Sequence, residues 1–233
     1  MSNEKSPIKK LLRKTKLGAR YLDDLPFKVM LTASVSFAFN AIFAIYNQVL
    51  GLLGNSLWFL VLSGYYMILG AMRIGVVLGG RKNPISNKER GLTDNELTIF
   101  TFCGILLVVL TFEFAAAAYL SFTRDLATEY DELVMVSVSV YTALRLAFAI
   151  RNMVIARKSR APLLSVIRDI SCADAAASVF TLLRSLILYR YIVIDHRISK
   201  AVAVIVFLFV LGLGVNMLIR VQRERKKLKE DKK

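Results

Sequence analysis

The 233-residue sequence is poor in the residues that most often bind metals or carry catalysis. It holds one histidine, His196, in a predicted loop, and two cysteines, Cys103 and Cys172, inside long apolar runs. This set predicts neither a disulfide nor a metal site. A glycine-rich phosphate loop and a paired Ser/His/Asp arrangement are also missing. These absences disfavour an enzyme and predict no cofactor. Carboxylates within the apolar runs leave a membrane-embedded enzyme as an alternative.

Long apolar runs dominate the rest of the sequence, which is 56% hydrophobic. A helix of about 20 mostly apolar residues crosses a bilayer, and backbone within lipid must satisfy its own hydrogen bonds. Six runs are long enough, although charge interrupts the fifth. They cover residues 29–53, 56–79, 97–122, 133–156, 163–187 and 199–221. We therefore predict an all-α bundle of six transmembrane helices, residues 29–221, between basic tails at 1–28 and 222–233.

The positive charges, +15 net, gather in both tails and in the loops after the second and fourth runs. Such a surplus can indicate a nucleic-acid partner. Here its distribution matches the enrichment of Lys and Arg in cytoplasmic loops, since Gly51–Asn55 is uncharged and residues 123–132 carry four acidic residues against one arginine. The pattern predicts a multi-pass protein of the cytoplasmic (inner) membrane with both termini inside and no nucleic-acid partner. The first 28 residues are too polar for a cleavable signal peptide.

The lipid bilayer is the expected main partner, with anionic lipids at the basic tails. Ile8–Leu17 has helical apolar spacing among lysines, which fits an interfacial helix; a disordered basic tail fits equally well. Gly75 and Gly79 form a small-xxx-small pair, which lets helices approach closely. It favours packing within the chain over dimerisation, although a homo-oligomer or a membrane-protein partner stays open.

Local signals place two helix starts. Thr93-Asp94-Asn95-Glu96 fits the capping box, in which the Thr and Glu side chains satisfy free backbone donors. It predicts that the third helix begins near residue 94. Pro162 can occupy the first turn of the fifth helix.

Several polar side chains fall near the middle of the predicted spans, where charge is costly and marks a functional site. Ser171, Asp174, Ser178 and Thr181 follow spacings of three and four, which places them on one face of the fifth helix. Arg73 lies nearer the cytoplasmic end of the second span. The full set of candidate site residues is Asn40, Tyr65, Tyr66, Glu113, Arg145, Asp174, Ser171, Ser178 and Thr181.

Two interpretations of these residues compete. In the first, Glu113 pairs with Arg145 and the hydroxyl groups hold helices together. In the second, the polar faces line a cavity, and two acids against one midplane arginine leave one carboxylate free to hold a proton or a cation. The second predicts a transporter-like protein with a polar midplane site. The alternative is a non-transporting scaffold or subunit of a membrane complex.

Short motifs resemble a family of uncharacterised bacterial multi-span membrane proteins. The resemblance covers most of residues 29–190 and implies the same kind of bundle. The matching residues are Asn40–Gly51, Asn55-Ser56-Leu57-Trp58-Phe59, Tyr65, Tyr66 and Arg73, then Tyr141, Pro162-Leu163-Leu164, Asp174 and Ser178.

The spacing of Asn40, Gly51 and Ser56 is also similar to the first two helices of the cation diffusion facilitators. That resemblance implies six spans with both ends in the cytoplasm and a metal site of His/Asp pairs on the second and fifth helices. Here the fifth helix keeps Asp174, but Ile170 stands four residues before it. Leu62, Tyr65 and Leu69 occupy the approximate places on the second. No metal-binding domain is expected after the sixth span, so the resemblance extends to the scaffold and not to a zinc site.

The predicted orientation can be tested by cysteine labelling. Single cysteines at Asn55 and Thr128 should react with a membrane-impermeant reagent applied from outside intact cells. Cysteines at Asn87 and Ser159 should react only after the membrane is opened. The opposite pattern would overturn the orientation.

Overall fold

The computed structural model describes residues 25–82, 93–123, 132–157, 162–188 and 196–230. These segments form six helices and no strand, which confirms the all-α prediction. The helices are α3 (Leu25–Leu53), α4 (Leu57–Lys82), α5 (Asp94–Thr123), α7 (Glu132–Arg157), α8 (Pro162–Leu188) and α9 (His196–Glu230). The predicted interfacial segment, Ile8–Leu17, lies outside the described residues.

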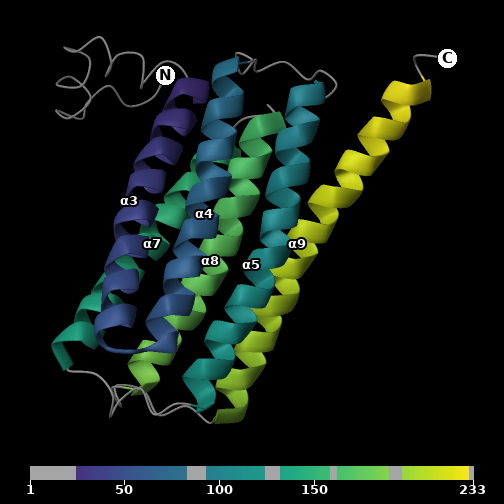
Figure 1. Cartoon of the computed structure of the whole chain (residues 1–233). Coiled ribbons are helices and arrows are strands. Elements are labelled where there is room, and N and C mark those ends of the chain that lie inside the picture. Colours follow the sequence, from purple (N-terminus) through teal and green to yellow (C-terminus); the bar gives the residue numbers. More distant parts are fainter. Residues whose placement is uncertain (1–24, 83–92, 124–131, 158–161, 189–195, 231–233) are drawn as a thin grey trace, which may run out of the picture.

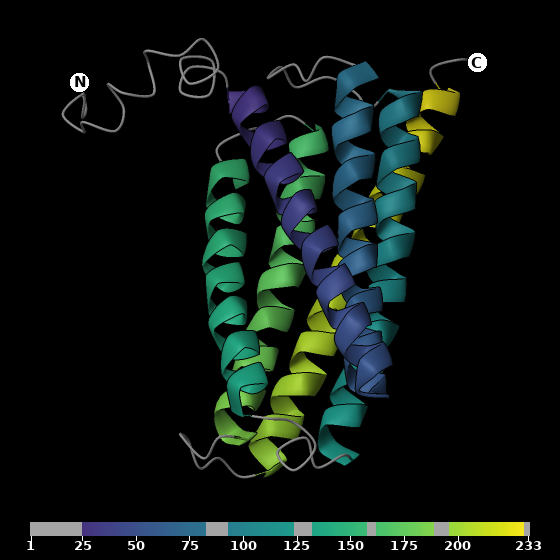
Figure 2. The same cartoon turned by 60° about the vertical axis from the view of Figure 1, so that its left-hand side comes forward.

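The helices run alternately down and up, so each is antiparallel to the next along the chain (Figure 1). Leu25 of α3 and Glu230 of α9 therefore lie at the same end of the bundle. The main packing pairs are α3 with α4, α7 with α8, and α5 with α9. Helix α8 also contacts α3, α4, α5 and α9, and it lies among the other helices in both views (Figures 1 and 2). The most polar helix face thus occupies the middle of the bundle.

Helix ends follow from local chemistry. The Thr93 backbone N–H donates to Glu96 Oε2 at 2.9 Å, and Leu97 N–H donates to the Thr93 carbonyl at 2.9 Å. The glutamate half of the predicted capping box is therefore present, and α5 begins at Asp94, as predicted. Pro162 opens α8, as predicted. Between α3 and α4, Asn55 has φ 48°, a left-handed conformation that Asn tolerates better than most residues.

The last helix differs from its prediction at both ends. The apolar run stops at Val221, but α9 begins at His196 and continues to Glu230. The prediction that His196 lies in a loop was therefore wrong. The extension is rich in Arg, Lys, Gln and Glu, which are strong helix formers, and Lys227 pairs with Glu224 at 3.0 Å. Hydropathy marks where a helix leaves an apolar environment, not where it ends.

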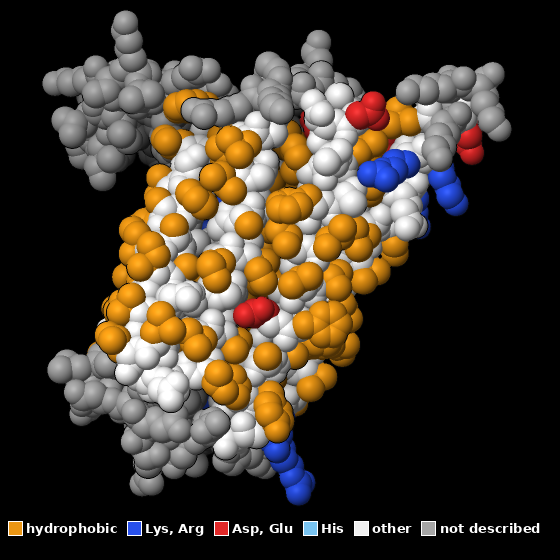
Figure 3. Space-filling model, in the orientation of Figure 1, with side chains coloured by type: hydrophobic (Ala, Val, Ile, Leu, Met, Phe, Trp, Pro, Cys, Tyr) orange, Lys and Arg blue, Asp and Glu red, His pale blue; other side chains and the backbone are white. Residues whose placement is uncertain are grey.

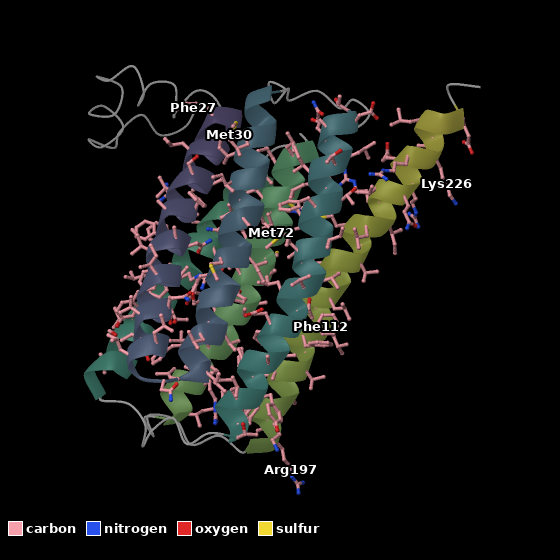
Figure 4. All side chains as sticks on the ribbon, in the orientation of Figure 1. Phe27, Met30, Met72, Phe112, Arg197 and Lys226 are labelled. Atoms are coloured by element: carbon pink, nitrogen blue, oxygen red, sulfur yellow. The ribbon has the colours of Figure 1, made fainter. Side chains whose placement is uncertain are left out.

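Among the residues that the structure describes, four helices are long and apolar enough to span a membrane, which indicates a membrane protein. The qualifying segments are Met30–Leu53, Leu57–Gly79, Asp94–Thr123 and Arg197–Leu228. Helix α8, which carries Arg168, Asp169, Asp174 and Arg184, is not among them. Hydrophobic side chains cover most of the middle of the bundle face drawn in Figure 3. Arg197 and Lys226 mark opposite ends of α9, with Phe112 of α5 between them in depth (Figure 4).

Small residues bring neighbouring helices together. A Cβ on Gly214 of α9 would lie 3.2 Å from both the Leu107 side chain and the Val108 backbone nitrogen of α5. A Cβ on Gly104 would meet the Leu218 side chain at 2.8 Å. On α4, Gly75 and Gly79 face side chains of α5. The predicted use of the Gly75–Gly79 pair for packing within the chain is therefore confirmed.

Two glycines of α9 offer a matched test of this close approach. Gly214→Leu should lower the free energy of unfolding by about 1–3 kcal/mol, because the added atoms overpack the α5 contact. Gly212→Leu should leave it nearly unchanged, because a Cβ there meets nothing within 4 Å. Unfolding of both variants in detergent micelles measures the difference. Equal stability of the two variants would contradict the packing described.

Candidate functional site

Three charged side chains from three helices meet in the middle of the bundle. Arg73 Nη2 of α4 donates to Asp174 Oδ2 of α8 at 2.7 Å. Arg145 Nη2 of α7 lies 2.7 Å from Asp174 Oδ1. The second contact lacks hydrogen-bond alignment, so charge attraction is what holds it. We call Arg73, Arg145 and Asp174 the charge cluster.

The positions of these residues explain how they meet. Arg145 and Asp174 lie near the middle of α7 and α8. Arg73 lies beyond the middle of α4, but long helical side chains lean toward the N-terminus of their helix. That direction brings the Arg73 guanidinium back to the depth of Asp174. The side chains are only 5%, 8% and 2% exposed for Arg73, Arg145 and Asp174.

Aromatic rings surround the Arg145 guanidinium. Its Cζ lies 4.2 Å from the ring centre of Tyr66 and 5.2 Å from that of Tyr65. Both contacts are within cation–π distance. The Tyr141 ring packs edge-on against Tyr66 and stacks on Phe43 of α3. The rings fix the arginine beside Asp174 and exclude water from one side of it.

A cavity of about 270 Å³ lies next to the charge cluster, between α3 and α7. Arg73, Arg145 and Asp174 all line it, together with Asn40 of α3. Asn40 is 2% exposed, and its Nδ2 has no hydrogen-bond partner among the described residues. Arg145 Nε and Nη2 also lack a hydrogen-bond acceptor there. The groups beside the cavity therefore include donors without acceptors, and Asp174 Oδ1 likewise has no donor among the described residues. Such buried groups are rare in proteins.

The charge cluster carries two positive charges against one negative charge. Both oxygens of the Asp174 carboxylate face a guanidinium group, so a cation at Asp174 would also lie beside two positive charges. The sequence predicted two acidic groups against one arginine at the midplane, whereas the cluster holds two arginines against one acidic group. The arrangement attracts an acceptor-rich anion, which arginine binds well through its fork of donors.

Glu113 does not join the cluster. Within the described part of the chain it forms no ion pair, so the predicted pairing with Arg145 was wrong. It is partly exposed on α5, and its carboxylate lies against Gly64 of α4. Figure 3 shows carboxylate atoms among hydrophobic side chains over these two helices. Glu113 shares the depth of Arg145 but points to another side of the bundle.

The fifth-helix hydroxyl groups divide between two environments. Ser171 is fully buried, and its Oγ has no hydrogen-bond partner among the described residues. Ser178 and Thr181 line a separate cavity of about 20 Å³ with Trp58 and Phe114, and Thr181 Oγ1 also donates to the Ala177 carbonyl at 3.0 Å. That space fits one water molecule and is too small for a solute. The predicted polar face of the fifth helix is thus packed against its neighbours. Of its residues, only Asp174 lines the larger cavity beside the charge cluster.

Arg184, another buried arginine, has a structural role. Its guanidinium donates to the carbonyl of Ser121 in the last turn of α5 and lies over the Phe122 ring. Carbonyls in the last turn of a helix have no partner within the helix, and a cation there stabilises them. Arg184 therefore caps α5.

The sequence pattern missed two parts of the site. Arg73 was noted in the second span but was not included in the candidate set, because its backbone lies away from the midplane. The α3 wall was represented by Asn40 alone, although Leu31, Val35 and Phe39 also line the cavity. Their spacing of four residues places them on one face of α3, but lipid-facing residues show the same spacing.

Comparison with known protein families and with proteins of curated function gave no match to this chain. The resemblances to a bacterial multi-span family and to the scaffold of cation diffusion facilitators therefore stay predictions. The structure itself carries the functional interpretation.

The cluster makes an asymmetric prediction about stability. Asp174→Asn should lower the free energy of unfolding by about 3–5 kcal/mol, because it leaves two buried guanidinium groups uncompensated. Arg73→Gln should cost clearly less, since a neutral Arg145–Asp174 pair remains. Unfolding in detergent micelles measures both variants.

Asp169→Asn is the control on the same helix, because Asp169 is partly exposed and pairs with its neighbour Arg168 at 3.2 Å. It should be nearly neutral. If Arg73→Gln proved as damaging as Asp174→Asn, the shared-carboxylate arrangement would be wrong.

Proposed function

We propose that this protein is a carrier-like integral membrane protein that binds a small organic anion in the cavity beside Arg73, Arg145 and Asp174. One observation carries the proposal: the charge cluster has a net positive charge and lines a cavity with unused donors. The anion would complete the hydrogen bonding of Asn40 Nδ2 and Arg145, and would balance the second arginine.

The anion replaces the cation or proton that the sequence pattern predicted. A cation at the single carboxylate would lie beside two guanidinium groups, and like charges repel strongly where solvent is excluded. Asp174 instead sets the orientation of both arginines. Its negative charge also moderates the site, because two uncompensated arginines would be expensive to bury.

The membrane setting is part of the same proposal. All six helices are taken to cross the cytoplasmic membrane. Helix α8 can do so because α3, α4, α5, α7 and α9 pack around it, and α7 packs on α8 and α3. Both termini would face the cytoplasm, where the basic residues of the carboxyl end of α9 meet anionic lipid. Leu25 and Glu230 lie at one end of the bundle, which supports placing both termini on the same side.

The binding claim can be tested with purified protein in nanodiscs. A panel of monocarboxylates, sulfonates and phosphate monoesters should include at least one anion that raises the melting temperature, with neutral amides and amines of the same shape as controls. A ligand at about 100 times its Kd adds about 2.7 kcal/mol of stability. Amines should give no stabilisation.

Arg73→Gln is the informative variant, because it leaves a neutral ion pair and should fold. It should lose most of the anion-dependent shift, whereas Arg168→Gln, which removes a partly exposed arginine outside the cavity, should keep it. Flux of the stabilising anion in proteoliposomes then tests carriage. Stabilisation by amines alone, or an undiminished anion shift in Arg73→Gln, would overturn the proposed function.

A further inference from the structure

We propose that the anion is an amphiphile taken from the bilayer, with one carboxylate or phosphate head and an apolar tail, and that it reaches the charge cluster sideways between α3 and α7. This inference rests on the proposed anion site and specifies its ligand class and its path.

The cavity has two chemically distinct zones. The charged and amide groups of Asn40, Arg73, Arg145 and Asp174 form the polar zone. The remaining wall is largely apolar and comes from α3 and α7, namely Leu31, Val35, Phe39, Leu144 and Phe148. A fully hydrophilic anion would bind the polar zone but would make no apolar contacts with the rest of the wall. An amphiphile satisfies both.

The apolar wall is also part of the outer surface. Leu31, Val35 and Phe39 are 41%, 47% and 45% exposed, and Leu144 and Phe148 are 57% and 42% exposed. These side chains therefore border the mouth of the cavity. They lie within about 14 Å of Asn40 or Arg145 along their helices, so the mouth opens at the depth of the lipid chains. The surroundings of the mouth favour a ligand that is dissolved in lipid.

The contacts between α3 and α7 allow passage between them. Each helix packs mainly on its own hairpin partner, α3 on α4 and α7 on α8. The described contacts across the α3–α7 boundary are side-chain contacts, such as the Phe39 and Phe148 rings at 5.9 Å and Tyr46 Oη with Ser137 Oγ at 3.5 Å. Figure 2 shows α3 running obliquely to α7. Rotation of aromatic side chains can widen this boundary without breaking a helix.

An additional arginine lies along the path. Arg151 of α7 is exposed and lines the cavity. It stands about 9 Å farther than Arg145 toward the end of the bundle that carries both termini. An anionic head that leaves the membrane surface would meet Arg151 first and the charge cluster second. The cavity volume, about 270 Å³, lies just below the range of typical ligand sites, so it holds a head and the start of a tail, with the rest of the tail in lipid.

Photolabelling in phosphatidylcholine nanodiscs tests this inference. The probe is a palmitate with a diazirine near its carboxyl end, and mass spectrometry locates the label. We expect labelling of residues 31–40 and 141–151, displaced by unlabelled palmitate and not by acetate or inorganic phosphate. The methyl ester of the same probe should label these segments about tenfold less, which corresponds to about 1.4 kcal/mol.

Two surface substitutions provide a matched pair that should fold. Val35→Trp places a large ring at the mouth and should reduce labelling severalfold. Ile42→Trp, on the same helix at a 59% exposed position that does not line the cavity, should leave it unchanged. Equal labelling by the methyl ester, or equal effects of the two tryptophans, would overturn the inference.

The experiment also separates the two proposals. If acetate, phosphate or another water-soluble anion stabilises the protein through Arg73 while palmitate does not label the cavity, the amphiphile is wrong and the anion site stands. If neither class of anion binds, both are wrong.

Discussion

The sharing of the Asp174 carboxylate between two guanidinium groups determines much of this structure. A charge in the interior of a membrane protein is rarely found without a partner, and here Asp174 pairs with both Arg73 and Arg145 across three helices. The cluster requires α4, α7 and α8 to meet at one depth. It also requires α8 to lie inside the bundle, because no other position would shield Asp174 from lipid.

The remaining helices complete this arrangement. Helices α3, α4, α5 and α9 supply long apolar surfaces, while α8 supplies the charged centre. Gly104 and Gly214 let α5 and α9 approach closely, and Arg184 closes the end of α5. The excess positive charge then makes the cavity between α3 and α7 electrostatically suited to an anion. The same residues thus serve the fold and the proposed function, since the arginines that stabilise Asp174 would also attract the anion.

Local chemistry made some features predictable from the sequence. The capping box at Thr93 and the proline at position 162 act within a single turn, so the starts of α5 and α8 could be placed from sequence alone. The depth of Asn40, Arg145 and Asp174 could also be predicted, because helical rise is fixed at about 1.5 Å per residue.

The pairing of charges could not be predicted in the same way. Two side chains pair only if they share a depth and if their helices are rotated so that they face each other, and only the depth follows from the sequence. Glu113 matches Arg145 in depth but faces Gly64 on a different side of the bundle. Arg73 seemed too far from the midplane because its backbone was considered without the lean of its side chain. The end of α9 was missed for a related reason, since helix propensity continues where hydropathy stops. Rotation and side-chain reach are set by packing among all the helices.

The most direct test of the shared carboxylate is a solid-state NMR measurement in lipid bilayers. Dipolar coupling between ¹³C at aspartate Cγ and ¹⁵N at arginine Nη reports their proximity, and Asp174→Asn identifies the signal of Asp174. We predict that this coupling weakens in Arg73→Gln, weakens in Arg145→Gln, and disappears only when both arginines are replaced. Coupling that a single arginine substitution abolishes, or that neither changes, would contradict the arrangement on which the proposed site depends.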